Sequence, residues 1–391
     1  MVIYYFLAVI SCWFGLQSLL SGIRYAAYVR RETNRPLPDF QPFVSVIAPG
    51  RGLEPGLIDN LRPLVAQDYP RYEVLFVFDA LDDPALKIVD VLKSTATVAT
   101  HTVITGPATD SGQKVHNLRV AVNRIDSQSE VLVFVDSDAR PAPDWLRKLV
   151  APLADETLGA STGYRWFIPE RGGIASRLRS IWNASVASAL GSDTAKNFCW
   201  GGSTAIRLNT FKSLNVSDRW RGSVSDDFTI THVLKEAKLP IHFTPRCLVA
   251  SVGDCDFREL VEFTTRQIKI TRVYASHLWL PLLLGSALFA IAFFGGLILI
   301  GVHPRSSAAY IFPLIIFTLG AAKSFIRFRA VSTVLKTSRL DLIAHILLWP
   351  FASLLYLYNA VVAGFSRRIK WRGITYELKS PTEAVIISRD S

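Results

Sequence analysis

Long stretches without charged side chains flank a central region in which the apolar segments are short. The first 23 residues carry no formal charge, and further runs without Asp, Glu, Lys or Arg cover residues 273–304, 306–322 and 342–366. A helix needs about 20 apolar residues to cross the core of a bilayer. Three of these runs are long enough, and the run at 306–322 is marginal. The pattern therefore predicts an N-terminal membrane anchor and a C-terminal group of transmembrane helices.

The first run is interpreted as a retained anchor rather than a cleaved signal peptide. Signal peptides begin with basic residues and end at a small-residue cleavage site. Here no Lys or Arg precedes the run, and Arg24, Arg30, Arg31 and Arg35 follow it. Because basic residues favour the cytosolic side, we expect the C-terminal end of this helix to face the cytosol.

The central region alternates between apolar segments and segments with helical spacing. The strand-like segments are 43–49, 72–78, 101–105 and 130–135, and the helical ones are 57–67, 83–93 and 117–125. This alternation predicts an α/β fold with a mostly parallel sheet covered by helices on both faces. Ligands of such sheets bind beyond the carboxyl ends of the strands. Two of the segments end there in an aspartate, Asp79 and Asp136.

The C-terminal membrane region has an ambiguous topology. Residues 257–274 form an amphipathic pattern, which predicts a helix lying in the membrane interface, or else an ordinary domain helix. Basic clusters lie on both sides of the 342–366 run, so both favour the cytosol. Either this run re-enters the membrane at Trp349-Pro350, or residues 306–322 do not fully span it.

The net charge of +11 does not indicate a nucleic-acid partner. The basic residues gather in 24–35, 323–339 and 367–372, beside the apolar runs, where they suit anionic headgroups. A nucleic-acid-binding protein would carry them on its soluble face. The cysteines, which show no zinc-binding spacing and which we expect to be small buried hydrophobic residues, are Cys12, Cys199, Cys247 and Cys255.

The sharpest chemical motif is Asp136-Ser137-Asp138, directly after an apolar segment. Two carboxylates at this spacing can reach one Mg²⁺ or Mn²⁺, which completes its shell with phosphate oxygens and water. Such an ion neutralises charge on a departing diphosphate. The alternative is a turn whose aspartate caps the following helix.

Further candidates lie at two other places in the soluble region. Asp79, followed by Asp82 and Asp83, is placed to accept the imide N–H of a uracil, although Asp83 can instead cap the next helix. Lys114 can contact a diphosphate as a point charge, or it can be a solvated surface lysine.

Asp226-Asp227 forms the third acidic site. Adjacent carboxylates repel one another, which raises the pKa of the pair and suits a general base, with Asp227 favoured. The alternative is an acidic helix start, since 228–237 has helical spacing.

Several motifs in order resemble one family. They lie at 53–61, 68–74, 82–85, 114–118, 136–140, 201–203, 226–227 and 369–376. In these segments the chain resembles family 2 glycosyltransferases, and within them the ceramide glucosyltransferases. The resemblance implies a GT-A nucleotide-sugar-binding fold, a UDP-sugar donor, a divalent metal and inversion at the anomeric carbon.

The resemblance also implies roles for individual residues. It places Asp79 and Asp83 by the uridine, Asp136 and Asp138 on diphosphate and metal, and Asp227 as the base beside Asp226. One extra residue after Asp79 leaves the uridine contact open among Asp79, Asp82 and Asp83.

The family's (Q/R)xxRW motif falls on residues 266–270, where Arg266 and Lys269 are donor-binding candidates. Lys269 replaces its arginine and Ile270 replaces its tryptophan, which argues against processive polymer synthesis.

The sequence thus predicts a multi-pass integral membrane enzyme with a cytosolic catalytic domain, which in a bacterium would lie in the plasma membrane. It would transfer a hexose, with glucose favoured, from a UDP-sugar to a lipid acceptor such as ceramide. A processive polysaccharide synthase and a catalytically silent membrane scaffold are the alternatives. The expected parts are an anchor (1–24), a GT-A domain (40–255), an interfacial helix (256–275), transmembrane helices (276–366) and a basic cytosolic tail (367–391).

Overall fold

The computed structural model describes residues 2–303 and 307–390. Residues 1, 304, 306 and 391, at which expected segments begin or end, lie outside the described residues. The chain divides into two compact units. One unit, called here the sheet unit, comprises residues 32–167, 190–253 and 367–391; the other, the helical unit, comprises residues up to 31, 168–189 and 254–366.

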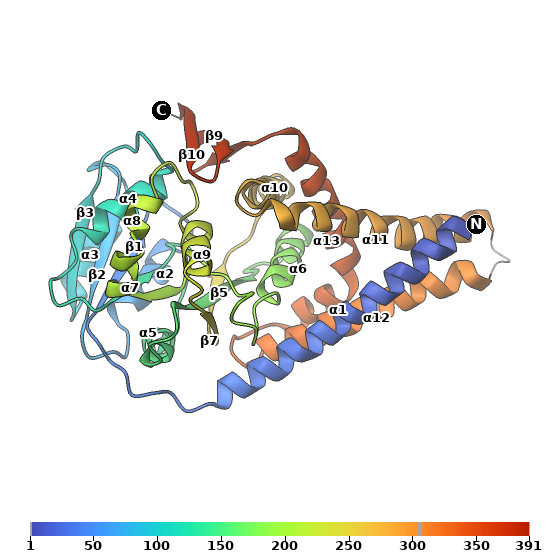
Figure 1. Cartoon of the computed structure of the whole chain (residues 1–391), viewed down its shortest axis with the longest axis horizontal. Helices are drawn as coiled ribbons and strands as arrows, with labels where there is room; N and C mark the ends of the chain where they lie inside the picture. The colour runs from blue at the N-terminus through green and yellow to red at the C-terminus, as the bar shows by residue number, and fades with distance from the viewer. Residues whose placement is uncertain (1, 304–306, 391) are drawn as a thin grey trace. The chain divides into compact units, whose positions relative to one another are not determined.

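A mixed seven-stranded sheet forms the centre of the sheet unit (Figure 1). Its order is β3-β2-β1-β4-β6-β5-β7, with β3, β2, β1 and β4 parallel and β6 antiparallel to both neighbours. The strands are β1 (Val44–Pro49), β2 (Tyr72–Phe78), β3 (Ala99–Ile104), β4 (Val131–Phe134), β5 (Ala160–Ile168), β6 (Thr204–Arg207) and β7 (Ile241–Val252). The four predicted strand segments and the α/β class are therefore confirmed.

The strands β1, β2 and β4 are buried along their whole length, because their side chains are apolar on both faces and helices cover the sheet. The helices of the sheet unit are α2 (Leu57–Leu61), α3 (Leu86–Thr95), α4 (Gln113–Val122), α5 (Trp145–Val150), α7 (Leu208–Ser213), α8 (Val216–Arg219) and α9 (Asp226–Glu236), with 3-10 helices η1 (Arg62–Val65) and η2 (Ala151–Ala154). The helix expected from residue 117 begins four residues earlier, at Gln113, so Lys114 lies in its first turn.

The last residues of the chain form an antiparallel sheet of three strands, β8 (Arg368–Trp371), β9 (Ile374–Ser380) and β10 (Glu383–Arg389). The sequence pattern predicts only a basic tail in this region. These strands belong to the same compact unit as the large sheet, although more than a hundred residues of the other unit precede them in the chain.

The helical unit contains α1 (Val2–Asn34), α6 (Ile174–Ala187), α10 (Phe257–Tyr274), α11 (Ser276–Val302), α12 (Ser307–Val331) and α13 (Arg339–Phe365). In the described part of the chain, four of these helices, α1, α11, α12 and α13, are long and apolar enough to cross a membrane (Figure 1). They indicate a membrane-associated protein.

The uncharged run that is marginal in length lies in a longer helix, since α12 continues to Val331. Lys323 donates a hydrogen bond to Ser18 Oγ of α1 at 2.7 Å and Arg327 is only 2% exposed, so both cations are accommodated inside this unit. Re-entry at Trp349-Pro350 is excluded because α13 is one continuous helix with Pro350 in its interior. The helix α10 has the predicted bounds, and its buried Thr264 and Thr265 hydroxyls donate to Asn359 Oδ1 of α13.

Candidate active site

Lys114 lies between two of the acidic residues predicted from the sequence. Its Nζ is 2.7 Å from Asp136 Oδ1, just after β4, and 3.1 Å from Asp226 Oδ1, the first residue of α9. The lysine side chain is 14% exposed, so the alternative of a solvated surface lysine is wrong. One ammonium group thus holds together two carboxylates that lie 90 residues apart in the chain.

A second cation completes this centre from β5. Arg165 Nη2 is 3.6 Å from Asp136 Oδ2, and Arg165 Nη1 is 3.3 Å from Asp138 Oδ2. The guanidinium also lies over the ring of Trp200, 4.8 Å from its centroid. The alternative role for the aspartate pair, capping the next helix, is wrong because α5 begins only at Trp145, after its N-cap Asp144.

The two adjacent aspartates at the start of α9 have different surroundings. Asp226 is buried and bonds to Lys114, whereas Asp227 is half-buried. Asp227 Oδ1 accepts hydrogen bonds from the Ser225 hydroxyl and from the Phe228 N–H at 2.8 Å, and Asp227 Oδ2 accepts one from Gly201 N at 3.5 Å. The pair does form an acidic helix start, yet only Asp226 faces the lysine.

Burial and charge shift the pKa values of these groups in opposite directions. Burial is the largest influence on the Asp226 carboxyl; Lys114 opposes it, Asp227 and Asp136 add to it, and the pKa of Asp226 is raised to about 6. Burial also acts to raise the pKa of Asp136, but Lys114 and Arg165 outweigh it and hold that pKa below its ordinary value. Burial disfavours the charged form of Lys114, yet the surrounding carboxylates keep its pKa above the ordinary value.

The residues of this centre fit a divalent cation. When all are ionised, four carboxylates and two cations leave a net charge of −2, and Asp226 Oδ2 is buried without a hydrogen-bond partner in the described part of the chain. Within residues 2–303 and 307–390, no three His, Cys, Asp or Glu side chains are grouped to hold a metal by themselves. An ion bound to Asp136 and Asp138 would therefore complete its shell with water or ligand phosphate, as Mg²⁺ and Mn²⁺ do. The four carboxylates counted here are those of Asp136, Asp138, Asp226 and Asp227, and the two cations are Lys114 and Arg165.

Asp79 follows β2 at the same edge of the sheet. Since β2 and β4 both flank β1, their ends are about 10 Å apart. Asp79 Oδ2 is 3.6 Å from Arg51 Nε. Asp83 instead accepts hydrogen bonds from the backbone N–H groups of Gly52, at 2.8 Å, and Ala85, at 2.9 Å, so it fixes the loop before α3. The uridine contact of Asp79 and of Asp83 stays a prediction.

Arg266 and Lys269 lie on α10, in the other compact unit. The guanidinium of Arg266 lies 5.6 Å from the ring centroid of Phe263, and burial lowers the pKa of Lys269. Their donor-binding roles stay predictions.

The sequence pattern missed Arg165 and Ser225. Arg165 is the one charged residue of the largely buried strand β5, a segment that was not predicted to be a strand. An isolated cation in a buried strand is the signal that identifies it. Ser225 is the N-cap of α9 and accepts from Phe228 N, which a serine before two acidic residues indicates.

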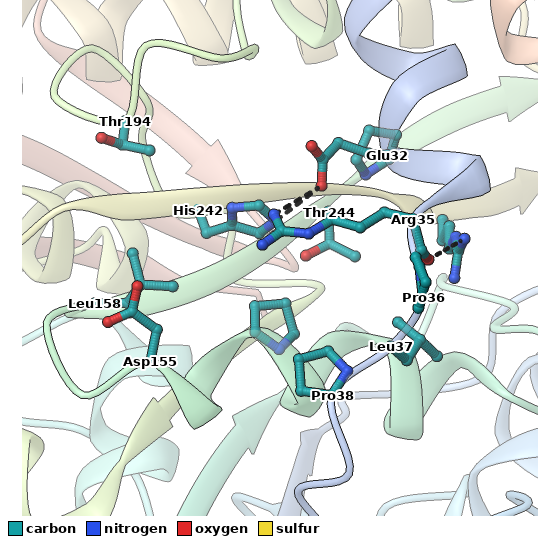
Figure 2. Close-up of a pocket in the computed structure, with 13 residues that line it drawn as sticks. Glu32, Arg35, Pro36, Leu37, Pro38, Asp155, Leu158, Thr194, His242 and Thr244 are labelled. Atoms are coloured by element: carbon teal, nitrogen blue, oxygen red, sulfur yellow. Dashed lines mark hydrogen bonds and ion pairs between the residues drawn. The ribbon is translucent and has the colours of Figure 1, made fainter.

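A cavity of about 260 Å³ lies elsewhere in the sheet unit and contains none of the predicted site residues (Figure 2). Glu32 Oε2 lies in it 3.7 Å from both Arg35 Nη1 and His242 Nε2. His242 is near the start of β7, whereas Ala250, eight residues later, pairs with Arg140 beside the acidic centre. At 3.3 Å per residue the cavity is roughly 26 Å from that point, at the opposite edge of the sheet.

Comparison with known proteins gives one family match and several similar structures. The model of the family described as Glycosyl transferase family 21 matches residues 3–384. Among solved structures, the mannosyltransferase PcManGT from Pyrobaculum calidifontis, in complex with GDP-Man and Mn²⁺, is 19% identical with a TM-score of 0.48, covering 91% of this chain and 98% of that one. S. aureus TarS 1–349 is 14% identical with a TM-score of 0.38, covering 89% and 100%. The same TarS fragment in complex with UDP gives a TM-score of 0.37 at the same identity and coverage.

Replacing Gly201 by alanine should destabilise the sheet unit. A Cβ at Gly201 would lie 2.1 Å from Asp226 Oδ2 and 2.8 Å from Lys114 Nζ. Overpacking of this kind costs about 1–3 kcal/mol, which a lower thermal unfolding midpoint of the detergent-solubilised protein would reveal. Gly191→Ala is the control, because a Cβ there meets no atom within 4 Å. Equal midpoints for the two variants would contradict the packing described.

Removing the Lys114 ammonium group should leave the buried negative charges of Asp136 and Asp226 without their neighbouring positive charge. Lys114→Met is expected to lower the free energy of unfolding by about 3–5 kcal/mol at pH 7.5. The loss should be smaller at pH 5, because the variant lacks the lysine that opposes the rise in the Asp226 pKa, so its folded state binds a proton at Asp226 more tightly than the wild type does and no longer buries that charge. The exposed Lys212 provides the control Lys212→Met. A loss that is the same at both pH values would refute the pairing.

Proposed function

Because the chain belongs to glycosyl transferase family 21, we propose that it transfers a hexose, with glucose favoured, from a UDP-sugar to a lipid hydroxyl such as that of ceramide. The product is a glycolipid with an inverted anomeric carbon. The protein is membrane-associated, and we extend this to a multi-pass integral protein whose sheet unit faces the cytosol, since Arg24, Arg30, Arg31 and Arg35 follow the first apolar run.

The observation that carries the proposal is the sharing of Lys114 by Asp136 and Asp226 at the carboxyl edge of the sheet. Ligands of open α/β sheets bind at this edge. Asp79, at the end of a strand about 10 Å away, would bind the nucleoside of the donor, and Lys114 would contact its diphosphate. These roles account for a cluster of buried charges that contributes little to stability by itself.

Asp136 and Asp138 are the proposed ligands of Mg²⁺ or Mn²⁺. When bound, the ion supplies electrostatic neutralisation of the charge that develops on the departing diphosphate. Lys114 and Arg165 lie against the same carboxylates and add fixed positive charge to that region.

Asp227 is the proposed general base. The Ser225 hydroxyl and the Phe228 N–H hold its carboxylate in one orientation. It accepts the proton of the lipid hydroxyl as that oxygen forms a bond to the anomeric carbon and the bond from that carbon to the diphosphate oxygen breaks. One displacement of this kind inverts the configuration. Membrane helices that hold the lipid within reach replace a bimolecular search by positioning.

Asp227→Asn tests the base. An amide cannot accept the proton, so transfer should fall by about 10²–10⁴-fold while UDP affinity, measured by calorimetry, changes little. Transfer is measured by mass spectrometry of lipid products after incubation with labelled UDP-glucose and ceramide vesicles. Asp218→Asn, which changes an exposed carboxylate of the same unit that pairs with Arg221, should behave as the wild type. Turnover retained by Asp227→Asn would refute the assignment.

Metal removal tests the aspartate pair. Chelation with EDTA should abolish transfer, and Mn²⁺ or Mg²⁺ should restore it. Without the ion, the negative charge that develops on the departing diphosphate is not neutralised. Asp138→Asn should raise the metal concentration needed for half-maximal activity at least ten-fold. Asp144→Asn, six residues further on and paired with Lys148, should leave that concentration unchanged. Full activity of the chelated wild type would remove the metal from the proposal.

A further inference from the structure

The three-stranded C-terminal sheet places one buried tyrosine against the helix that carries Lys114. Along β9, Ile374, Tyr376 and Leu378 alternate with more exposed residues and are at most 2% exposed. A buried tyrosine hydroxyl needs a hydrogen-bond partner. The Gln113 N–H donates to Tyr376 Oη at 3.1 Å, across 263 residues of chain.

This hydrogen bond replaces an N-cap. The first N–H groups of a helix have no partner within the helix, and a side chain of the N-cap residue often accepts from one of them. The N-cap of α4 is Gly112, which has no side chain to offer. Tyr376 supplies the acceptor for Gln113, the first residue of α4, and Lys114 is the next residue along.

The neighbouring strand β10 holds the loop before α4, since Arg389 pairs there with Ile374, two residues from Tyr376. Arg389 donates to Ala108 O at 2.6 Å and to Gln113 Oε1 at 3.2 Å. The buried Gln113 side chain in turn accepts from Ala108 N and donates to Gly106 O, each at 2.9 Å. The loop and the first turn of α4 are thus fixed by a network that includes the last strand of the chain.

Two further loops of the candidate site meet the same sheet. Gly222, four residues before Asp226, has φ of +72° and approaches Thr382 so closely that an added Cβ would lie 1.9 Å from the Thr382 carbonyl oxygen. Arg372 forms an ion pair with Glu54, in the loop that follows β1 and also contains Arg51, the partner of Asp79. The first contact therefore falls on the loop that leads to Asp226, and the second on the loop that carries the partner of Asp79.

We propose that Tyr376 is a positioning residue for the donor site, acting through Gln113 to hold Lys114 between Asp136 and Asp226. The C-terminal sheet is then part of the transferase and not an appended tail. This inference rests on the proposed function, in which Lys114 contacts the donor diphosphate. A small displacement of a positioning group is costly, since 1 Å can reduce a rate 10²-fold.

The experiment compares Tyr376→Phe with Tyr72→Phe. Each change removes one buried hydroxyl that accepts from a backbone N–H, in the second case that of Gln67 at 2.9 Å. Tyr72 begins β2, at the opposite end of that strand from Asp79, so it serves as the matched control. The measurements are the calorimetric Kd for UDP, the KM for UDP-glucose and for ceramide in vesicles, and the thermal unfolding midpoint.

Tyr376→Phe should raise the Kd for UDP and the donor KM about ten-fold while leaving the ceramide KM and the unfolding midpoint at the values of Tyr72→Phe. Arg389→Met should act in the same direction, because it frees the same loop. A purely structural role would lower the midpoint without changing the donor KM, and that result would overturn the inference.

The failure of the inference and that of the proposed function give different results. If the wild type binds UDP and forms glycolipid while Tyr376→Phe keeps the wild-type Kd and KM, only the role of Tyr376 is refuted. If the wild type neither binds UDP nor forms glycolipid, the proposed function fails and the inference fails with it.

Discussion

The burial of one lysine between carboxylates constrains the rest of the sheet unit. The Lys114 ammonium can stay charged in this place only while Asp136 and Asp226 remain within hydrogen-bonding distance. The strand β4, the helix α4 and the helix α9 must therefore keep their ends together. Gly201 allows this approach because any side chain at that position would occupy the space of the Asp226 carboxylate. Electrostatics and packing depend on each other at this site.

The parallel half of the sheet could be predicted because its signal is local. Strands buried on both faces must be apolar at nearly every position, and β2 was predicted with its observed bounds. The start of α4 was not predicted, because its first turn has no cap in the neighbouring sequence. Its acceptor, Tyr376, lies in the last strands of the chain. A helix boundary that is fixed by a contact over 263 residues gives no local pattern.

The site was predictable as a set of acidic residues but not as an arrangement. The adjacency of Asp226 and Asp227 does not tell which one faces the lysine; that depends on how α9 begins after its N-cap Ser225. Arg165 was missed because β5 was not recognised as a strand. This arginine nevertheless carries a large part of the positive charge around Asp136 and Asp138. Residues with the same chemistry acquire different roles from their backbone positions.

The place of the small sheet after α13 in the chain has a consequence for biosynthesis. Chains fold as they are made, N-terminal parts first. The seven-stranded sheet is complete once Val252 has left the ribosome, but Tyr376 and Arg389 emerge only after α11, α12 and α13. The first turn of α4, which carries Lys114, therefore lacks its final support until all the long apolar helices have been translated. Chains that lack β8, β9 and β10 would hold an unfinished centre, so catalytic competence would arise only after these strands have joined the sheet unit.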